Sequence, residues 1–414
     1  MDTRKDYGSA VTLLDLDDDR ETWQRFEKTL KAVKVVLILL LAFVVAYFFL
    51  NSTMIYFLFH KNAERDPRWE ESRDYSIFRN NFPSKAFEIR KPLNRSQIYR
   101  ERMERIKEWN DGGNVVFEAN KFADWSEDEI KKILMHRVPP EGFDCSPFCP
   151  NATASEPPRS WGSWQRERAH KSVSELIEAS LRTHSAPDAF DWRTKNAISP
   201  VKDQGSCGSC WAFATTGLVE AANAIDSGKA PLSLSEQELV DCDMNNAGCL
   251  GGNYFASLRF VYHKGLLKNS DYAYTGKIGR CAENDRKAAA KIEFFSLIRS
   301  EEAMLTSYLS LYGPFIVTMN TTLELTAYKS GVFHPSEDSC RRGNLGSHAL
   351  LVVGYGTSKD GVKYWIVKNS WGANWGREGG YMHFVRGVNA CGIEDYPVGA
   401  FARLPHNLRS SSFG

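Results

Sequence analysis

The strongest apolar segment of the chain lies near its N-terminus, between Val35 and Phe59, where only Asn51-Ser-Thr53 breaks the run. As an α-helix, these 25 residues reach about 37 Å, against a hydrocarbon core of ~30 Å. A cleaved signal peptide is the main alternative, but its apolar core would have ~7–15 residues behind a short basic head, whereas here the head is 34 residues long. The pattern therefore favours an uncleaved signal-anchor helix that spans a membrane.

Beyond this segment, the pattern divides the chain in two. Residues 60 to 185 are charged and show helical periodicity from Tyr99 to Trp109. From about 186 to 290 the pattern predicts helices: an alanine-rich run with a 3.6-residue rhythm follows Cys210, and Ser235 to Glu238 has the form of a capping box. Later come short apolar runs separated by glycines, which predict an antiparallel β-barrel: 315–319, 350–353 and 364–368. The fold class is therefore α+β.

Composition narrows the functional classes. A formal net charge of +1 gives no reason to expect nucleic acid or another polyanion as a partner. The chain has no metal-ligand spacing, and we expect neither a metal nor another cofactor. Nine cysteines fit an even set of disulfides plus one free thiol. With the sequons at Asn94, Asn151 and Asn320, they indicate an oxidising, secretory compartment.

The orientation of the membrane span follows from the same features. Basic residues are similar in number on its two sides, so flanking charge does not choose a direction. The cysteines and sequons all lie C-terminal to the apolar segment or at its end. We therefore expect a single-pass type II membrane protein, with a cytosolic tail of residues 1–34 and a lumenal or extracellular remainder.

Candidate chemistry is concentrated in the block Gln204 to Phe213, which contains Cys210. A thiol in the first turn of a helix feels the positive end of the helix dipole, which favours the nucleophilic thiolate. His348 opens an apolar, strand-like run 138 residues downstream, and Asn369 lies 159 residues downstream in Lys-Asn-Ser-Trp-Gly. A nucleophile, a base and a side chain that orients the base are the parts that acyl transfer requires.

Together these three blocks resemble the papain-like cysteine proteases over residues 186 to 402. The resemblance implies a helical left lobe and a β-barrel right lobe, with the active site in the cleft between them. It implies that Cys210 attacks the peptide carbonyl, that His348 transfers the proton and that Asn369 orients the imidazole. Gln204, with the Cys210 backbone N–H, would bind the oxyanion. The implied disulfides are Cys207–Cys249, Cys242–Cys281 and Cys340–Cys391.

Substrate contacts are also implied by position in the family. Gly251 and Gly252 would let an extended peptide add as a strand, because side chains there would obstruct it. Trp371 would cover the bond between Asn369 and His348. The pocket for the second residue before the scissile bond would be surrounded by Asn253, Tyr254, Thr318, Ala349 and Tyr396. Tyr396 at its base would make that pocket shallow and suited to medium apolar side chains.

Residues 60–185 resemble a cathepsin propeptide. The helical motif of such propeptides is matched at Arg95, Tyr99, Ile106 and Asn110, and a second motif at Asn120 to Asp124. Three positions depart from the family: Lys91, Arg102 and Glu118. The resemblance implies a zymogen, and we expect acid to loosen it by protonating carboxylates such as Asp124.

The end of the segment carries two further predictions. Cys145 and Cys149 could form a local disulfide outside the family pattern. Residues 157 to 184 read as a protease-sensitive linker, with processing near Ser185 to Pro187.

The predicted organisation is thus a tail (1–34), a membrane anchor (35–59), an inhibitory propeptide (60–185) and a peptidase domain (186–414). We expect a monomeric endopeptidase acting on peptides or proteins in a lysosome-like or vacuolar compartment, inhibited by its own propeptide. Two alternatives remain: a catalytically silent binding or regulatory protein of the same fold, and a chain whose working part is an inhibitor of other proteases in residues 60 to 185.

Overall fold

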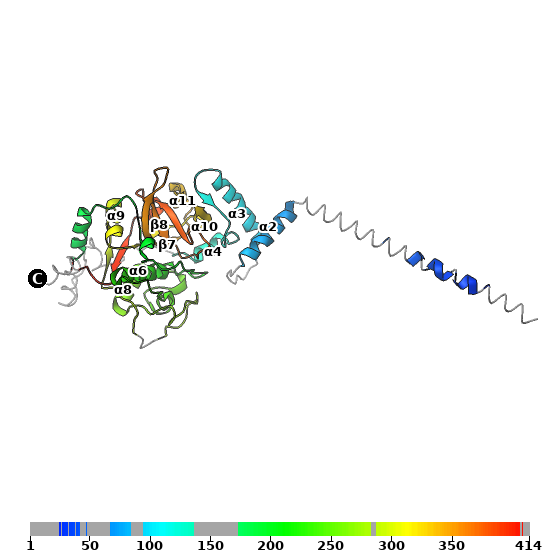
Figure 1. Cartoon of the computed structure of the whole chain (residues 1–414), viewed down its shortest axis with the longest axis horizontal. Coiled ribbons are helices and arrows are strands. Elements are labelled where there is room, and N and C mark those ends of the chain that lie inside the picture. The colour runs from blue at the N-terminus through cyan, green and yellow to red at the C-terminus, as the bar shows by residue number, and fades with distance from the viewer. Residues whose placement is uncertain are drawn as a thin grey trace, which may run out of the picture. The chain divides into compact units, whose positions relative to one another are not determined.

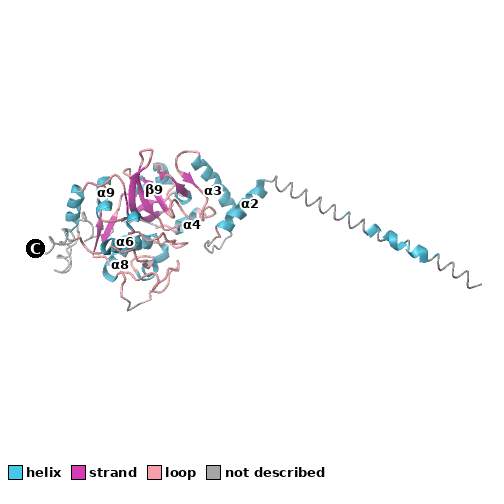
Figure 2. Ribbon diagram, in the orientation of Figure 1, coloured by secondary structure: helices cyan, strands magenta, loops and turns pink. Residues whose placement is uncertain are grey.

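The structure is a computed structural model of the chain, shown in Figures 1 and 2. It describes residues 67–83, 94–135, 173–282 and 287–405, together with residue 408 and scattered helical positions between 25 and 47. Residues Phe78–Gly414 form one compact unit, and Met1–Ile77 form another. The site described below lies within the first of these.

One lobe is mainly helical, as the pattern predicts. Its central helix α6 (Cys210–Ser227) is buried along most of its length and ends at Gly228, whose φ of 65° is left-handed and suits glycine. Around it lie α7 (Glu236–Cys242) and α8 (Tyr254–Lys264). Ser235 caps α7 by accepting a 3.0 Å hydrogen bond from the Glu238 backbone N–H. The short 3₁₀ turn η2 (Gly248–Leu250) completes this lobe, whereas Trp192 of η1 (Trp192–Lys195) packs on the core of the other lobe.

The other lobe is built on an eight-stranded sheet. Its strand order is β3-β10-β4-β7-β8-β9-β6, with β2 pairing with β7 off this path. The strands are β2 (Phe190–Asp191), β3 (Phe294–Leu297), β4 (Phe315–Asn320), β6 (Val332–Phe333), β7 (Ser347–Thr357), β8 (Lys363–Lys368), β9 (Tyr381–Val385) and β10 (Val398–Phe401). The pairs are antiparallel, as predicted, except β6 with β9 at one edge, which is parallel.

Strand β7 is buried on both faces, which explains its continuous apolar run. Leu350 and Val352 belong to the core that contains α9 (Glu302–Leu311), whereas Ala349, Leu351 and Val353 belong to the core around α6. Successive side chains of a strand point to opposite faces, so this alternation is the expected one. The two cores therefore meet at β7, and α6 packs against it (Figure 1). The lobe also contains α10 (Leu323–Ala327), α11 (Glu337–Arg342) and η3 (Ala390–Gly392).

Up to residue 135, the predicted propeptide has four described elements: α2 (Pro67–Asn81), α3 (Arg95–Asn110), β1 (Val116–Phe117) and α4 (Glu127–Lys132). Strand β1 pairs antiparallel with β5 (Tyr328–Ser330) in a separate two-stranded sheet, so the segment is hydrogen-bonded to the protease part of the chain. Arg102, which departs from the family's propeptide pattern, joins the predicted propeptide to the right lobe. Its guanidinium is buried and donates to the Thr326 hydroxyl and to the Trp125 carbonyl, both at 3.2 Å. Lys91 and the pair Cys145 and Cys149 lie outside the described residues.

The linker prediction for residues 157 to 184 is wrong for its last part. Residues 173 to 183 form a helix, and Val173, Ile177 and Leu181, spaced four apart, are all buried in the right-lobe core. The Ser180 hydroxyl lies 2.6 Å from that of Tyr312, and Glu178 pairs with Arg299 at 2.9 Å. The abundance of Ser, Arg and Lys suggested a loop, but an apolar stripe at helical spacing docks this segment on the protein.

The three disulfides that the resemblance implies are present: Cys207–Cys249, Cys242–Cys281 and Cys340–Cys391. Among the described cysteines, Cys210 is the free one.

The predicted membrane anchor at 35–59 falls mostly on positions that the structure does not describe. Among the positions that it does describe, none of the helices is long and apolar enough to cross a membrane. The anchor therefore stays a prediction from the sequence.

Replacing Ile177 by alanine should destabilise the folded chain by about 2–5 kcal/mol, because it removes a buried aliphatic side chain and leaves a cavity. The matched control is Glu175→Ala on the exposed side of the same helix, which should change the free energy of unfolding by no more than about 0.5 kcal/mol. Urea denaturation of both variants measures the difference. Equal stabilities would mean that this helix is not docked in solution.

Candidate active site

Cys210 is the first residue of α6, and the fold places it at the junction of the two cores. Its side chain is fully buried. The backbone amides of Ala349, from β7, and of Met135, from the predicted propeptide, both act to lower the pKa of the thiol. The N–H groups of the first helical turn have no acceptor within the helix, so this position offers donors to a developing negative charge.

His348 and Asn369 are brought together by the pairing of β7 with β8. His348 lies near the start of β7, and Asn369 follows the last residue of β8. The His348 Nε2 and Asn369 Oδ1 atoms are 2.8 Å apart. The indole of Trp371 stacks on the imidazole at 4.7 Å between ring centroids, with 23° between the planes, and is itself buried. These contacts fix the ring and keep water from the Nε2 bond.

The second imidazole nitrogen has no such partner. The Nδ1 atom of His348 is buried and makes no hydrogen bond to any residue within the described part of the chain. Because Asn369 Oδ1 can only accept a hydrogen bond, Nε2 carries a proton, and Nδ1 is free to accept one when the ring is neutral. This is the state that a general base requires.

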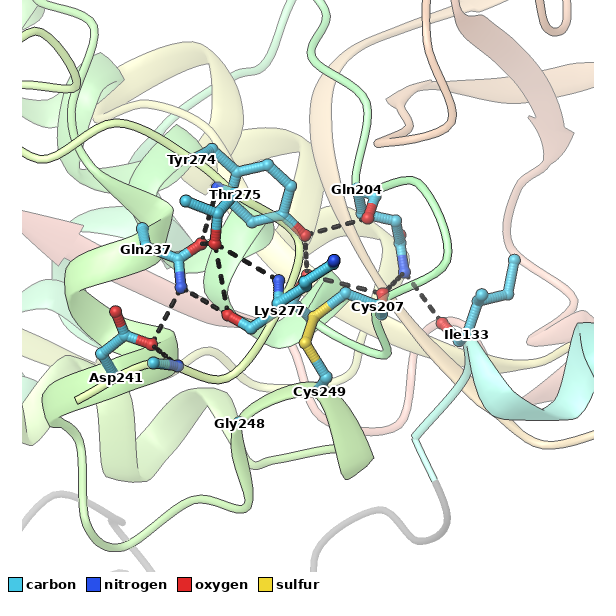
Figure 3. Close-up of a disulfide and its surroundings, with 12 residues drawn as sticks. Ile133, Gln204, Cys207, Gln237, Asp241, Gly248, Cys249, Tyr274, Thr275 and Lys277 are labelled. Atoms are coloured by element: carbon cyan, nitrogen blue, oxygen red, sulfur yellow. Dashed lines mark hydrogen bonds between the residues drawn. A yellow bond between two sulfur atoms is a disulfide. The ribbon is translucent and has the colours of Figure 1, made fainter. Parts of the chain in front are cut away.

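Both the oxygen and the nitrogen of the Gln204 side-chain amide are hydrogen-bonded. Its Oε1 accepts a 2.7 Å hydrogen bond from the Ser370 hydroxyl. Its Nε2 donates to the carbonyl oxygens of Cys207, at 2.9 Å, and of Ile133, at 2.8 Å. Figure 3 shows the amide of Gln204 facing Ile133, beside the disulfide from Cys207 to Cys249. A propeptide carbonyl thus takes up the donor that the resemblance assigns to the oxyanion.

The segment Ile133 to Met135 covers the site. Met135 and Ser347 form an antiparallel bridge, with N–H to carbonyl distances of 2.7 and 3.0 Å. Two glycines allow the close approach: a Cβ on Gly208 would lie 2.9 Å from the Lys132 carbonyl oxygen, and one on Gly346 would lie 3.1 Å from the Leu134 Cβ. Substrate would have to displace this segment.

Burial under this segment holds both titratable groups in their neutral forms. Burial raises the pKa of the Cys210 thiol to about 11, although the neighbouring backbone amides oppose the shift. Burial also lowers the pKa of His348 to about 4, against the effect of its hydrogen bond to Asn369. At neutral pH the covered pair is therefore a thiol and an imidazole, which is an inactive pair because the thiolate is the nucleophile.

The residues predicted to bind substrate are spread around the same junction. Gly252 cannot carry a side chain, since its Cβ would lie 2.6 Å from the Trp211 ring. Asn253 caps α8 through a 2.7 Å bond from the Phe255 N–H, and Tyr254 donates to the Tyr396 carbonyl at 2.8 Å. Thr318 pairs with Ala349 in the sheet, and Gly251, with a φ of 118°, follows η2. The side chain predicted to form the pocket base, Tyr396, is 42% exposed rather than enclosed.

Sequence reasoning missed a buried ionic cluster beside the site. Lys202 binds Glu220 and Glu236 at 2.7 and 2.6 Å, and Lys368 donates to the Ser199 hydroxyl at 2.9 Å, which in turn donates to Glu220. Burial disfavours the charge on Lys202, but Glu236 and Glu220 outweigh it and raise its pKa.

The cluster links the two lobes behind the site. It surrounds a cavity of about 20 Å³ that Asn369 and Ala349 also line. Residue spacing in the sequence could not predict this cluster, since its four charged residues come from four separate segments. Among the residues that the structure describes, no group of His, Cys, Asp and Glu is arranged to hold a metal ion.

Comparison with known proteins identifies the families that match this chain. Residues 186–401 match the family described as papain family cysteine protease, and residues 84–130 match the cathepsin propeptide inhibitor domain (I29). Cysteine proteinase 1 of Dictyostelium discoideum is 32% identical over 79% of this chain and 92% of its own length. Mouse pro-cathepsin H is 44% identical over 51% of this chain, and the match spans only 65% of that protein.

Solved structures agree in the fold. The digestive procathepsin L 3 of Tenebrio molitor larval midgut has a TM-score of 0.63 at 27% identity, covering 80% of this chain and 99% of that one. The proform of the ragweed pollen allergen Amb a 11, a cysteine protease, has a TM-score of 0.65 at 28% identity, covering 84% and 98%. The resemblance drawn from the sequence, to this protease family and its propeptide, is thereby confirmed.

Iodoacetamide should alkylate Cys210 at least a hundredfold more slowly in the intact chain at pH 7.5 than after another protease has removed the propeptide. A thiol with a pKa of about 11 is almost wholly protonated at that pH, and the Ile133 to Met135 segment blocks access. Mass spectrometry of the peptide containing Cys210 measures the rate. Equal rates in the two forms would show that the thiol is not covered in solution.

Acid should loosen the covered form partly through His348. Its pKa is lowered from 6.5 to about 4, so the unfolded chain takes up a proton first as the pH falls, and the stability that the neutral ring contributes is lost between pH 6.5 and 4. In an inactive Cys210→Ala background, His348→Gln should therefore lose less stability than its parent between these pH values. Urea denaturation at both pH values tests this, and identical losses would contradict it.

Proposed function

Because the chain belongs to the papain family of cysteine proteases and carries a cathepsin propeptide inhibitor domain, we propose that it is a cysteine endopeptidase made as a membrane-tethered zymogen. The single observation that supports the proposal is that Cys210, the His348–Asn369 pair and the Gln204 amide are all buried where the segment Ile133 to Met135 bonds Gln204 and bridges to Ser347 at the start of β7.

In the proposed mechanism, removal of Ile133 to Met135 returns water to the site. The pKa of Cys210 then falls and that of His348 rises, because burial is the first cause of both shifts. The thiol proton passes to Nδ1 of His348, which makes no other hydrogen bond to a described residue, and an ion pair results. Asn369 holds the ring through Nε2 during this transfer.

The thiolate attacks the peptide carbonyl carbon, and the carbonyl π electrons move to its oxygen. The Cys210 backbone N–H and Gln204 Nε2 stabilise that oxyanion, and the loss of one such donor typically costs ~2.7–4 kcal/mol of transition-state stabilisation. The imidazolium then protonates the leaving amine. Water attacks the resulting thioester, with His348 as the base, and releases the acid product and the thiol.

Inhibition by the propeptide rests on the same donors. Gln204 Nε2 already bonds the Ile133 carbonyl, and the start of β7 already bonds Met135. A substrate strand needs both sets of groups. Lys121 adds an ion pair to Asp203 at 2.7 Å, next to Gln204, and Phe122 packs edge-on against Trp371 at 5.0 Å. The propeptide is thus anchored on both sides of the site.

The tether is proposed from the sequence alone. The apolar segment 35–59 is long enough for a signal anchor, and the disulfides and sequons favour a lumenal or extracellular catalytic domain. A lysosome-like or vacuolar compartment suits an enzyme released from its propeptide by acid. Peptides or proteins are the proposed substrates, and the enzyme is proposed to act as a monomer without a cofactor.

The test compares full-length wild type with Cys210→Ala, both purified in mild detergent and shifted to mildly acidic pH with a thiol reductant. Wild type should shorten on a gel and begin to cleave a fluorogenic peptide amide, and the variant should do neither, since it lacks the nucleophile. If both stay inert after another protease has removed the propeptide, the catalytic proposal fails. The alternative of a silent binding protein would then replace it.

A further inference from the structure

Tyr274 joins Gln204, which carries one proposed oxyanion donor, to Ser209, which directly precedes the other donor at Cys210. Its hydroxyl donates a 2.9 Å hydrogen bond to the backbone carbonyl of Gln204 and lies 2.7 Å from the Ser209 hydroxyl. A phenol has one proton, so with that proton on Gln204 the Ser209 hydroxyl must be the donor to Tyr274. Ser209 is the N-cap of α6, directly before Cys210. Figure 3 shows the phenol of Tyr274 reaching Gln204.

We propose that Tyr274 is a positioning residue that sets the distance between the Gln204 amide and the first turn of α6, and so shapes the oxyanion site. This inference rests on the proposed function and adds a residue to it. Gln204 and Cys210 are joined by a short loop that contains two glycines, Gly205 with a left-handed φ of 61° and Gly208. The middle of this loop is held by the Cys207–Cys249 disulfide, and the Tyr274 hydroxyl joins the residues at its two ends, Gln204 and Ser209.

The platform that carries Tyr274 is fixed independently of the site. Gln237 of α7 accepts from the Thr275 N–H at 2.8 Å and donates to the Lys277 carbonyl at 2.7 Å. Asp241, one turn further along α7, accepts from the Gly279 N–H at 2.7 Å. Figure 3 shows Gln237 and Asp241 facing this loop. The Cys242–Cys281 disulfide closes it.

The aromatic ring is also held in place. It meets the ring of Phe213, in the first turn of α6, edge to face at 4.9 Å. Burial raises the pKa of the phenol, so its hydroxyl remains a donor. The hydroxyl is thus held in place by a loop bound to α7. It in turn holds the residues that carry or precede the two donors to the oxyanion. A displacement of either group matters, because the donors must already point at the position of the oxyanion before it forms.

The test uses the activated enzyme obtained from the full chain, as Tyr274→Phe. We expect kcat for a peptide amide to fall roughly tenfold while KM stays within about twofold, since the donors act on the transition state. A peptide aldehyde, whose thiohemiacetal oxygen occupies the oxyanion site, should bind more weakly by the same factor. Alkylation of Cys210 by iodoacetamide, which needs the thiolate but no oxyanion donor, should keep its rate.

Tyr272→Phe is the matched control, because the Tyr272 hydroxyl lies on the same loop but bonds Asp241, at 2.9 Å. It should resemble wild type in all three measurements. In a Gln204→Ala background, Tyr274→Phe should cost less than it does alone, because one of the two donors that it positions is already gone. If Tyr274→Phe does not fold, Ser209→Ala removes the other end of the bridge and should show the same pattern.

The outcomes separate the two proposals. If wild type cleaves no peptide, the proposed function fails. If wild type is active and Tyr274→Phe matches it in kcat, only the role of Tyr274 fails. The role also fails if the alkylation rate falls together with kcat, since the phenol would then support the thiolate rather than the oxyanion donors.

Discussion

The packing of α6 against β7 is the contact on which the rest of the structure depends. It brings the N-terminus of a helix to the start of a central strand, and so sets Cys210 beside the backbone of Ala349, the residue after His348. Neither element could be moved without cost, because β7 contributes alternate side chains to both cores. The same packing therefore holds the two lobes together and positions the site. It gives the site the rigidity that preorganised donors require.

The segment Ile133 to Met135 covers the site at this junction. Beyond its own helix, Ile133 to Met135 bonds the start of β7 and the Gln204 amide, the groups proposed to hold a peptide substrate. Its main chemical effect is dehydration, which moves the pKa values of Cys210 and His348 apart in the direction that keeps both neutral. Inhibition and protection of the thiol thus have one physical cause.

Several features could be read from the sequence because they depend on local pattern. Cys210 at a helix start, Ser235 as a cap and the apolar run of β7 each follow from residues adjacent in the chain. The family blocks added the three disulfide pairs and the propeptide. The helix at 173–183 was misread, because the Ser, Arg and Lys residues of the wider segment 157–184 outnumber the three apolar side chains that dock it. A stripe that short gains its meaning only when a core is present to receive it.

By itself, the sequence determined the residue types of the chemistry, the order of helices and strands, and a propeptide placed before the protease domain, since these depend on spacing along one chain. The tertiary structure alone decided which distant groups meet. The Ile133 carbonyl on Gln204, the buried contact of Arg102 with Thr326, the charges shared by Lys202 and Glu236, and the bridge from Tyr274 to Ser209 all join separate segments. Their physical reason is packing: burial selects partners by position in space, and pairs far apart in sequence leave no periodic trace in it.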